Sequence, residues 1–270
     1  MNKRTIIMKT RKKHYAIAYW MCVFCSLIAL KALAHDTFLL PVQKIYPVND
    51  DAEIRMSSGL SFPEQTWGVD ENRIDLAIFT LNAQAIDSPF YAKNKEYLSI
   101  NLNGSESGVI TAAISTKVRA GAIDNDNVDE YLDEIGATSD VKQAFHALPG
   151  NPSLQRSYVK HTKTFACVTS CDDKRNFMST PVGQKLEFIA VSDSNSRFRL
   201  LFEGKAMSNH KVKVKNTSKE TLTLMTDENG NVDLNGKMSG SVMLAAVALT
   251  LPDKPDGLYH SDQATLVLSL

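Results

Sequence analysis

The chain has 270 residues, of which 43% are hydrophobic, and its 30 Lys and Arg residues balance its 30 Asp and Glu residues. Seven of the basic residues and none of the acidic ones fall in residues 1–34, so the remainder carries 23 basic against 30 acidic side chains, a formal charge of −7. This acidic excess disfavours nucleic acid and anionic lipid as partners, because both depend on clustered Lys and Arg.

The first 34 residues have the layout of a secretory signal peptide. A basic stretch over residues 1–14 precedes an apolar run over residues 16–30 and then the small residues Ala32 and Ala34. The apolar run is short for a membrane span. We therefore expect cleavage after Ala34, a periplasmic protein without a membrane span, and His35 as its first residue. The alternative is an uncleaved anchor, because Lys31 lies close to the cleavage site.

Two cysteines, Cys167 and Cys171, lie outside the predicted signal peptide. In an exported chain such a pair predicts a disulfide, and closing so small a loop contributes roughly 2 kcal/mol by the loop-entropy estimate. The rival interpretation is a pair of thiolate metal ligands, which lacks the neighbouring histidine of a strong zinc pattern.

Short apolar or alternating segments, separated by Asn, Asp, Gly and Ser, predict a chain built mainly of β-strands. In the first half these segments are residues 52–58, 73–80, 96–102 and 108–116. A helical interlude follows at about residues 126–147, where Val128, Leu132 and Ile135 recur at helical spacing and acidic residues crowd the first turn. It predicts an inserted pair of antiparallel helices.

The C-terminal part is more regular and predicts five or six strands within residues 197–270. Asn229 and Gly230 can take positive φ in a turn between two of them. This is the pattern of a small antiparallel sandwich. We therefore expect two β-sandwich domains, immunoglobulin-like or prealbumin-like, over residues 35–193 and 194–270, with the helical insertion in the first.

A basic segment spans residues 154–168. Its basic side chains and its histidine are Arg156, Lys160, Lys163 and His161. The segment is too short to predict a nucleic-acid patch, and we expect it to form a solvated strand or helix face. We expect His146, in the helical insertion, to be a surface or half-buried residue, and His210, on the C-terminal hairpin, to lie at the surface.

Several motifs carry a resemblance to known families. The segments LFEGKAMSNHKVKVK and TDENGNVDL resemble the prealbumin-like or carboxypeptidase-regulatory-like module, with Ala206 where such modules usually have proline. The order HDTFLLP, GLSFPE, VDEYLDEIG, QRSYVKHTK, GQKLEFIAV, FRLLFEGKAM, TDENG and YHSDQATLVLSL resembles a family of exported bacterial proteins of unsettled function. That family is often labelled the periplasmic component of a cobalt or nickel uptake system. Its members typically begin H-D-F-W or H-x-x-W, a pattern from which Phe38 departs. The resemblance implies two β-sandwich-like domains and the handling of a divalent metal.

His35 is the leading candidate for a metal ligand. An N-terminal histidine offers its amine nitrogen and its ring Nδ1 in one chelate ring, and a second imidazole would complete a three-nitrogen site suited to Ni(II), Co(II) or Cu(II). The amine must be neutral and its ordinary pKa is about 8, so binding should weaken below about pH 7. Asp36 could add an oxygen, and His161 and His260 are the candidate second ligands. The alternatives are a disordered leading residue and two structural histidines.

Enzyme motifs are missing from the sequence. It has no Gly-x-Ser-x-Gly elbow, phosphate-cradling Gly loop or HExxH helix. We therefore expect a binding protein that captures a metal ion and hands it to a membrane transporter. One alternative is a copper-dependent oxidative enzyme with an N-terminal histidine site, although Trp67 is the only tryptophan after residue 34 and no flat aromatic sugar-binding face is evident. The other is an envelope adaptor whose sandwiches bind another protein.

Overall fold

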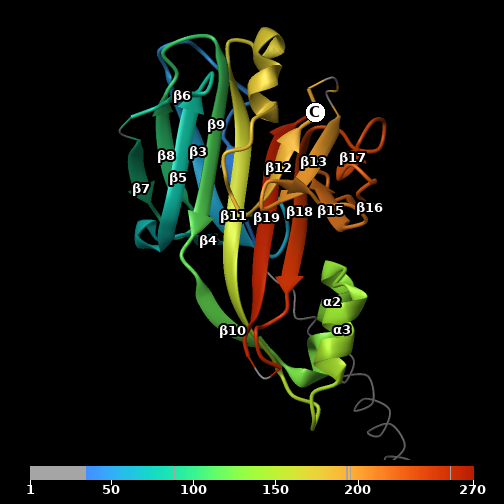
Figure 1. Cartoon of the computed structure of the whole chain (residues 1–270). Coiled ribbons are helices and arrows are strands. Elements are labelled where there is room, and N and C mark those ends of the chain that lie inside the picture. The colour runs from blue at the N-terminus through green and yellow to red at the C-terminus, as the bar shows by residue number, and fades with distance from the viewer. Residues whose placement is uncertain (1–34, 88, 193, 195, 256) are drawn as a thin grey trace, which may run out of the picture. The chain divides into compact units, whose positions relative to one another are not determined.

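The computed structural model describes residues 35–270 except residues 88, 193, 195 and 256. The predicted signal peptide and its cleavage site before His35 lie outside the described residues. The rest of the chain forms three β-sheets and two short α-helices (Figure 1). The prediction of a mainly β chain with a helical insertion is confirmed.

The largest sheet has ten strands and is shared by both halves of the chain. Its main order is β16-β15-β18-β19-β11-β9-β5-β6, and β2 and β10 also pair with β11. The strands are β2 (Ile45–Tyr46), β5 (Ile74–Leu81), β6 (Gln84–Ala85), β9 (Gly108–Thr116), β10 (Arg119–Ile123), β11 (Leu154–Val168), β15 (Lys211–Asn216), β16 (Thr221–Met225), β18 (Ser241–Thr250) and β19 (Tyr259–Ser269). In Figure 1 the long strand β11 runs beside β19, with which it pairs in parallel.

A second sheet, which we call the N-terminal sheet, packs on one face of the ten-stranded sheet. It consists of β1 (Asp36–Pro41), β3 (Asp51–Gly59), β4 (Trp67–Gly68), β7 (Phe90–Lys93) and β8 (Leu98–Asn103). Its inward side chains include Ile54 and Ile100, which meet Ile110 and Ile114 of β9 in one core. Alternation along β3 explains why this sheet has one buried face, because successive side chains of a strand point to opposite sides.

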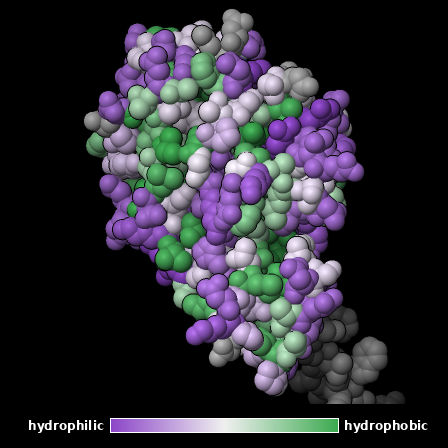
Figure 2. Space-filling view, in the orientation of Figure 1, coloured by the Kyte–Doolittle hydropathy of each residue, from purple (hydrophilic) through white to green (hydrophobic). Residues whose placement is uncertain are grey.

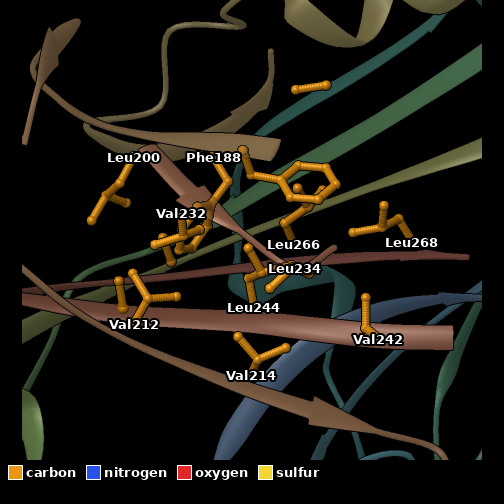
Figure 3. Close-up of a cluster of buried hydrophobic side chains, with 14 of the residues drawn as sticks. Phe188, Leu200, Val212, Val214, Val232, Leu234, Val242, Leu244, Leu266 and Leu268 are labelled. Carbon is orange, nitrogen blue, oxygen red and sulfur yellow. The ribbon is translucent and has the colours of Figure 1, made fainter. Parts of the chain in front are cut away.

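A third sheet, which we call the C-terminal sheet, consists of β12 (Leu186–Ala190), β13 (Arg197–Phe202), β14 (Lys205–Ala206) and β17 (Asn231–Asp233). Phe188 and Leu200 pack against Val212, Leu244 and Leu266 of the ten-stranded sheet (Figure 3). The chain therefore has two sandwich cores, and both use the ten-stranded sheet as one layer.

The predicted helical pair is present as α2 (Val128–Ile135) and α3 (Ser139–His146). Val128, Leu132 and Ile135 are buried, as their spacing predicts, and they pack with Leu154 and Tyr259 at the ends of β11 and β19. The described residues also form three 3-10 helices: η1 (Glu71–Arg73), η2 (Asn125–Asn127) and η3 (Asp172–Ser179).

Strand β11 separates the two cores by the alternation of its side chains. Phe165 belongs to the core under the C-terminal sheet, whereas Ala166 and Val168 belong to the core under the N-terminal sheet. Odd-numbered residues of β11 therefore face the C-terminal sheet, and even-numbered residues face the N-terminal sheet. On β19 the even-numbered residues share the first of these faces, because Ala264 and Leu266 lie in the C-terminal core.

The expectation that the basic segment is solvated is wrong. Arg156 is 8% exposed and Lys163 is 1% exposed, and Lys163 is paired with the buried carboxylate of Glu187. The expectation that His210 lies at the surface is also wrong, because it is buried and its Nε2 donates to Val247 O at 3.1 Å. Neither segment carries a local sequence signal for the partners that bury it.

The predicted disulfide is present between Cys167, at the end of β11, and Cys171. Strands from both sides of residue 193 pair in the ten-stranded sheet, so the domain boundary that we place there remains a prediction. Within the described residues, no helix combines the length and apolar character needed to cross a membrane. Hydrophilic side chains cover much of the face in Figure 2, with hydrophobic ones scattered among them.

Candidate functional site

The structure brings two of the predicted ligands together and places the other two elsewhere. His161 and His260 are on the face of the ten-stranded sheet that the C-terminal sheet covers, on β11 and β19. His35 and Asp36 lie at the start of the chain's described part, and β1 packs on the opposite face through Phe38 and Val267. Neither imidazole is therefore placed to complete a three-nitrogen site with His35.

His161 and His260 share one carboxylate oxygen. His161 Nε2 lies 3.1 Å from Asp262 Oδ1, and His260 Nε2 lies 3.4 Å from the same atom. Asp262 is 1% exposed and His161 is 5% exposed, whereas the His260 side chain is 29% exposed. The cluster of His161, His260 and Asp262, which we call the His–Asp cluster, thus opens to solvent on the side of His260.

Lys185 lies on the other oxygen of the same carboxylate. Its Nζ is 3.2 Å from Asp262 Oδ2, but the contact lacks hydrogen-bond geometry, and Oδ2 has no hydrogen-bond partner. The attraction is therefore mainly Coulombic. Burial by itself would raise the pKa of Asp262, but the hydrogen bond from His161 and the charge of Lys185 lower it below its ordinary value. Asp262 is consequently an anion at neutral pH.

Serine hydroxyls hold the opposite edge of each imidazole. Ser115 Oγ is 2.8 Å from His161 Nδ1, and Ser157 Oγ is 2.8 Å from His260 Nδ1. Gln184 Nε2 lies 3.3 Å from Ser115 Oγ and donates to it, which leaves that hydroxyl free to donate to His161. Nε2 of His161 then carries the proton that it donates to Asp262. Because a serine oxygen can also accept, Ser115 can accept from Nδ1–H in the opposite tautomer, which gives up the hydrogen bond from His161 to Asp262.

His35 lies in a different setting. Its ring contacts Trp67 edge to face at a centroid distance of 4.5 Å, and its carbonyl oxygen accepts from Lys160 Nζ at 2.7 Å. Burial and the charge of Lys160 lower the pKa of His35, with Asp36 opposing them, so the imidazole is neutral at neutral pH. Asp36 itself is paired with Lys215 at 2.6 Å and turned to that cation.

No described group of three or more His, Cys, Asp or Glu side chains already has the arrangement of a metal site. In the His–Asp cluster, His161 Nε2 donates to Asp262 Oδ1 and each Nδ1 atom contacts a serine hydroxyl, whereas Asp262 Oδ2 has no hydrogen-bond partner. The two Nε2 atoms could bind a metal ion together with Asp262 Oδ1 only when each imidazole carries its proton on Nδ1.

Asp262 and Lys185 were missed by the sequence reasoning. A signal for Asp262 was present: His260 and Asp262 are two residues apart in a strand, and this spacing puts both side chains on one face. Lys185 precedes β12 and carries no comparable signal, because its approach to Asp262 depends on how the C-terminal sheet packs.

The fold and the His–Asp cluster define a β-sandwich protein with a partly buried polar cluster between two sheets. The chain belongs to the family described as a domain of unknown function, DUF4198, whose model matches residues 32–250. This confirms the predicted membership in a family of unsettled function. No curated protein matches the sequence.

Two solved structures are similar in part. One is the D0-D1 domain of Intimin, at 10% identity and a TM-score of 0.21 over 87% of this chain and 98% of that chain. The other is the BSP domain of a biofilm associated protein, at 12% identity and a TM-score of 0.20 over 85% of this chain and 29% of that chain.

Proposed function

We propose that this chain is a periplasmic protein that binds a divalent transition-metal ion, Ni(II), Co(II) or Cu(II), at the His–Asp cluster, as an accessory to metal uptake. The observation that carries the proposal is the convergence of two Nε2 atoms on Asp262 Oδ1, at 3.1 and 3.4 Å. Ligand atoms that share a metal ion with bonds near 2.1 Å lie about 3 to 3.5 Å apart.

The donor set suits the metals predicted from the sequence. Imidazole nitrogen is a preferred ligand of late first-row metals, and one carboxylate oxygen completes a set with open positions for water or for a transfer partner. The half-exposed edge of His260 offers a route by which the ion can enter and leave. An ion that is to be transferred needs such access, whereas a permanently bound ion does not.

Two features weaken the cluster as a resting metal site. Each imidazole must carry its proton on Nδ1, where Ser115 and Ser157 can accept a hydrogen bond from it. Lys185 also places a positive charge beside Asp262. We therefore expect reversible binding and not the tight retention of a structural metal.

His35 provides a second location for the ion if cleavage follows Ala34. Its amine and Nδ1 would form one chelate ring, and its neutral imidazole is suited to the role. The neighbouring charge of Lys160 opposes a cation there. We therefore place the His–Asp cluster first and keep His35 as the alternative position.

Isothermal titration of the exported, processed protein with Ni(II) and with Co(II) tests the proposal. The expected result is micromolar or tighter affinity that falls by about ten-fold or more in His260→Gln and in Asp262→Asn. His146→Gln is the matched control, because His146 is a helix-surface imidazole paired with Asp129 and remote from the cluster.

The outcomes separate the two locations. Loss of affinity in His35→Ala alone would move the site to the amino terminus and leave the His–Asp cluster as a structural network. Wild-type affinity in all four variants, His260→Gln, Asp262→Asn, His35→Ala and His146→Gln, would contradict the metal-binding proposal. Intact-mass measurement of protein recovered from the periplasm tests the predicted cleavage and localisation at the same time.

A further inference from the structure

A cavity of about 200 Å³ lies beside the start of β1, on the face of the ten-stranded sheet opposite to the His–Asp cluster. Its walls come from β1, β3, β4, η1, β9, β10, β11 and the loop after β4. Trp67 and Tyr158 supply aromatic surface, and Thr37, Ser58 and Thr116 supply hydroxyl groups. Three of its charged residues are the cations Lys160, Arg73 and Arg119, and the fourth is Asp70.

The three cations form no ion pair with any carboxylate in the described part of the chain. The nearby acids are already occupied, because Asp36 pairs with Lys215 and Asp70 pairs with Lys93. The lining therefore carries three positive charges against the single carboxylate of Asp70, and a further negative charge would relieve the repulsion among the cations.

Hydrogen-bond donors also remain available in the cavity. Lys160 Nζ donates to His35 O at 2.7 Å and to Thr37 Oγ1 at 3.0 Å, which leaves one of its three N–H groups. Among the described residues, the Arg73 side chain makes a single hydrogen bond, from Nη2 to Lys117 O at 3.3 Å. Most donors of the two guanidinium groups are therefore free to meet an acceptor.

Arg156 adds a further positive charge on the same face of β11. Its guanidinium lies 4.9 Å from the ring centre of Tyr158, which lines the cavity, and its Nε and Nη1 have no hydrogen-bond partner. Arg156, Tyr158 and Lys160 are spaced two residues apart along the strand, so all three lie on the same face of the ten-stranded sheet. Tyr158 and Lys160 of the basic segment therefore line the cavity, and Arg156 adds its charge nearby.

We propose that this cavity binds a small oxyanion, a phosphate or a carboxylate, whose oxygens meet Lys160, Arg73 and Arg119. Charge-assisted hydrogen bonds from ammonium and guanidinium groups are the strongest that such a ligand can receive, and guanidinium geometry matches two oxygens of one anion. The rings of Trp67 and Tyr158 would pack on the rest of a larger carboxylate.

Titration calorimetry of the full processed chain with inorganic phosphate and, separately, with succinate tests this proposal in metal-free buffer at constant ionic strength. We expect one of the two anions to bind with a dissociation constant of about 1 mM or tighter. Arg119→Gln should weaken that binding about ten-fold. Arg119 is exposed and its replacement leaves the core intact, and Arg73→Gln gives a second, independent variant.

Lys205→Gln is the matched control, because it removes an equal charge from an exposed strand outside the cavity. Unchanged anion affinity in Lys205→Gln is expected. Failure of both anions to bind would overturn the proposal, and so would equal weakening in Arg119→Gln and Lys205→Gln, since the effect would then reflect net charge alone. A preference for phosphate or for succinate identifies the ligand class.

Discussion

His161 Nε2 lies 3.1 Å from Asp262 Oδ1, although 101 residues separate the two in the chain. The parallel pairing of β11 with β19 brings them together, because Val159 is opposite Asp262 and His161 is two positions further along the same face. The cluster therefore exists only when both halves of the chain are folded.

Lys185→Met should strengthen Ni(II) binding at the His–Asp cluster. Lys185 Nζ lies 3.2 Å from Asp262 Oδ2 and repels an incoming cation, so its removal should raise the affinity roughly five-fold. Titration calorimetry measures the change, with Lys205→Met as a control for net charge. An unchanged or lower affinity would show that the ion does not approach this carboxylate.

Lys163→Met should destabilise the protein by about 3 to 5 kcal/mol, because it leaves the buried Glu187 carboxylate without its cation. Glu187 also accepts from the backbone N–H groups of Val182 and Gly183 at 3.1 and 3.2 Å. The double variant Lys163→Met with Glu187→Gln should recover part of the loss, since a neutral amide oxygen can still accept. Urea unfolding measures all three proteins, and a double variant less stable than Lys163→Met would contradict the ion-pair explanation.

Lys160 should make stability rise with pH. Burial, partly opposed by Asp36 and reinforced by Arg156, lowers the pKa of Lys160 to about 8 from 10.5. The unfolded chain keeps this proton up to about pH 10.5, whereas the folded chain releases it near pH 8, so folding becomes more favourable between these values. The gain is at most about 3 kcal/mol.

The comparison of wild type with Lys160→Met isolates this effect from other groups that titrate at alkaline pH. The difference in the free energy of unfolding, wild type minus variant, should increase from pH 7.5 to pH 10 in buffer without phosphate or carboxylate. A pH-independent difference would mean that Lys160 keeps its ordinary pKa.

Replacing both Cys167 and Cys171 by Ser should cost about 2 kcal/mol, because the disulfide closes a small loop and restricts the unfolded chain. Chemical unfolding of the oxidised protein and of the double variant measures this. Addition of a reductant should lower the stability of the wild type and leave the variant unchanged, and a reductant effect on the variant would point to another cause.

The regular elements were predictable because their patterns are local. A largely apolar run of strand length predicted β9 to the residue, Gly108–Thr116, and helical spacing with an acidic first turn predicted the helical pair α2 and α3. These signals depend on neighbours within about ten residues, so a single sequence carries them.

The polar contacts between distant strands could not be predicted in the same way. The sequence predicted a solvated face for Lys163 and Arg156, because basic residues rarely occupy buried positions. Their burial depends on the C-terminal sheet, which brings Glu187, and on α2, which brings Tyr131 to within 5.2 Å of Arg156. The register between β11 and β19, which assembles the His–Asp cluster, likewise leaves no trace in either strand alone.

Strand β11 is 15 residues long and contributes side chains to both sandwich cores. No hinge is available along it, because a bend there would break its ladders to β19, β9 or β10. Heat should therefore melt the two halves in a single calorimetric step. A ligand that binds tightly on one face of this strand would then raise the melting temperature of both halves of the chain.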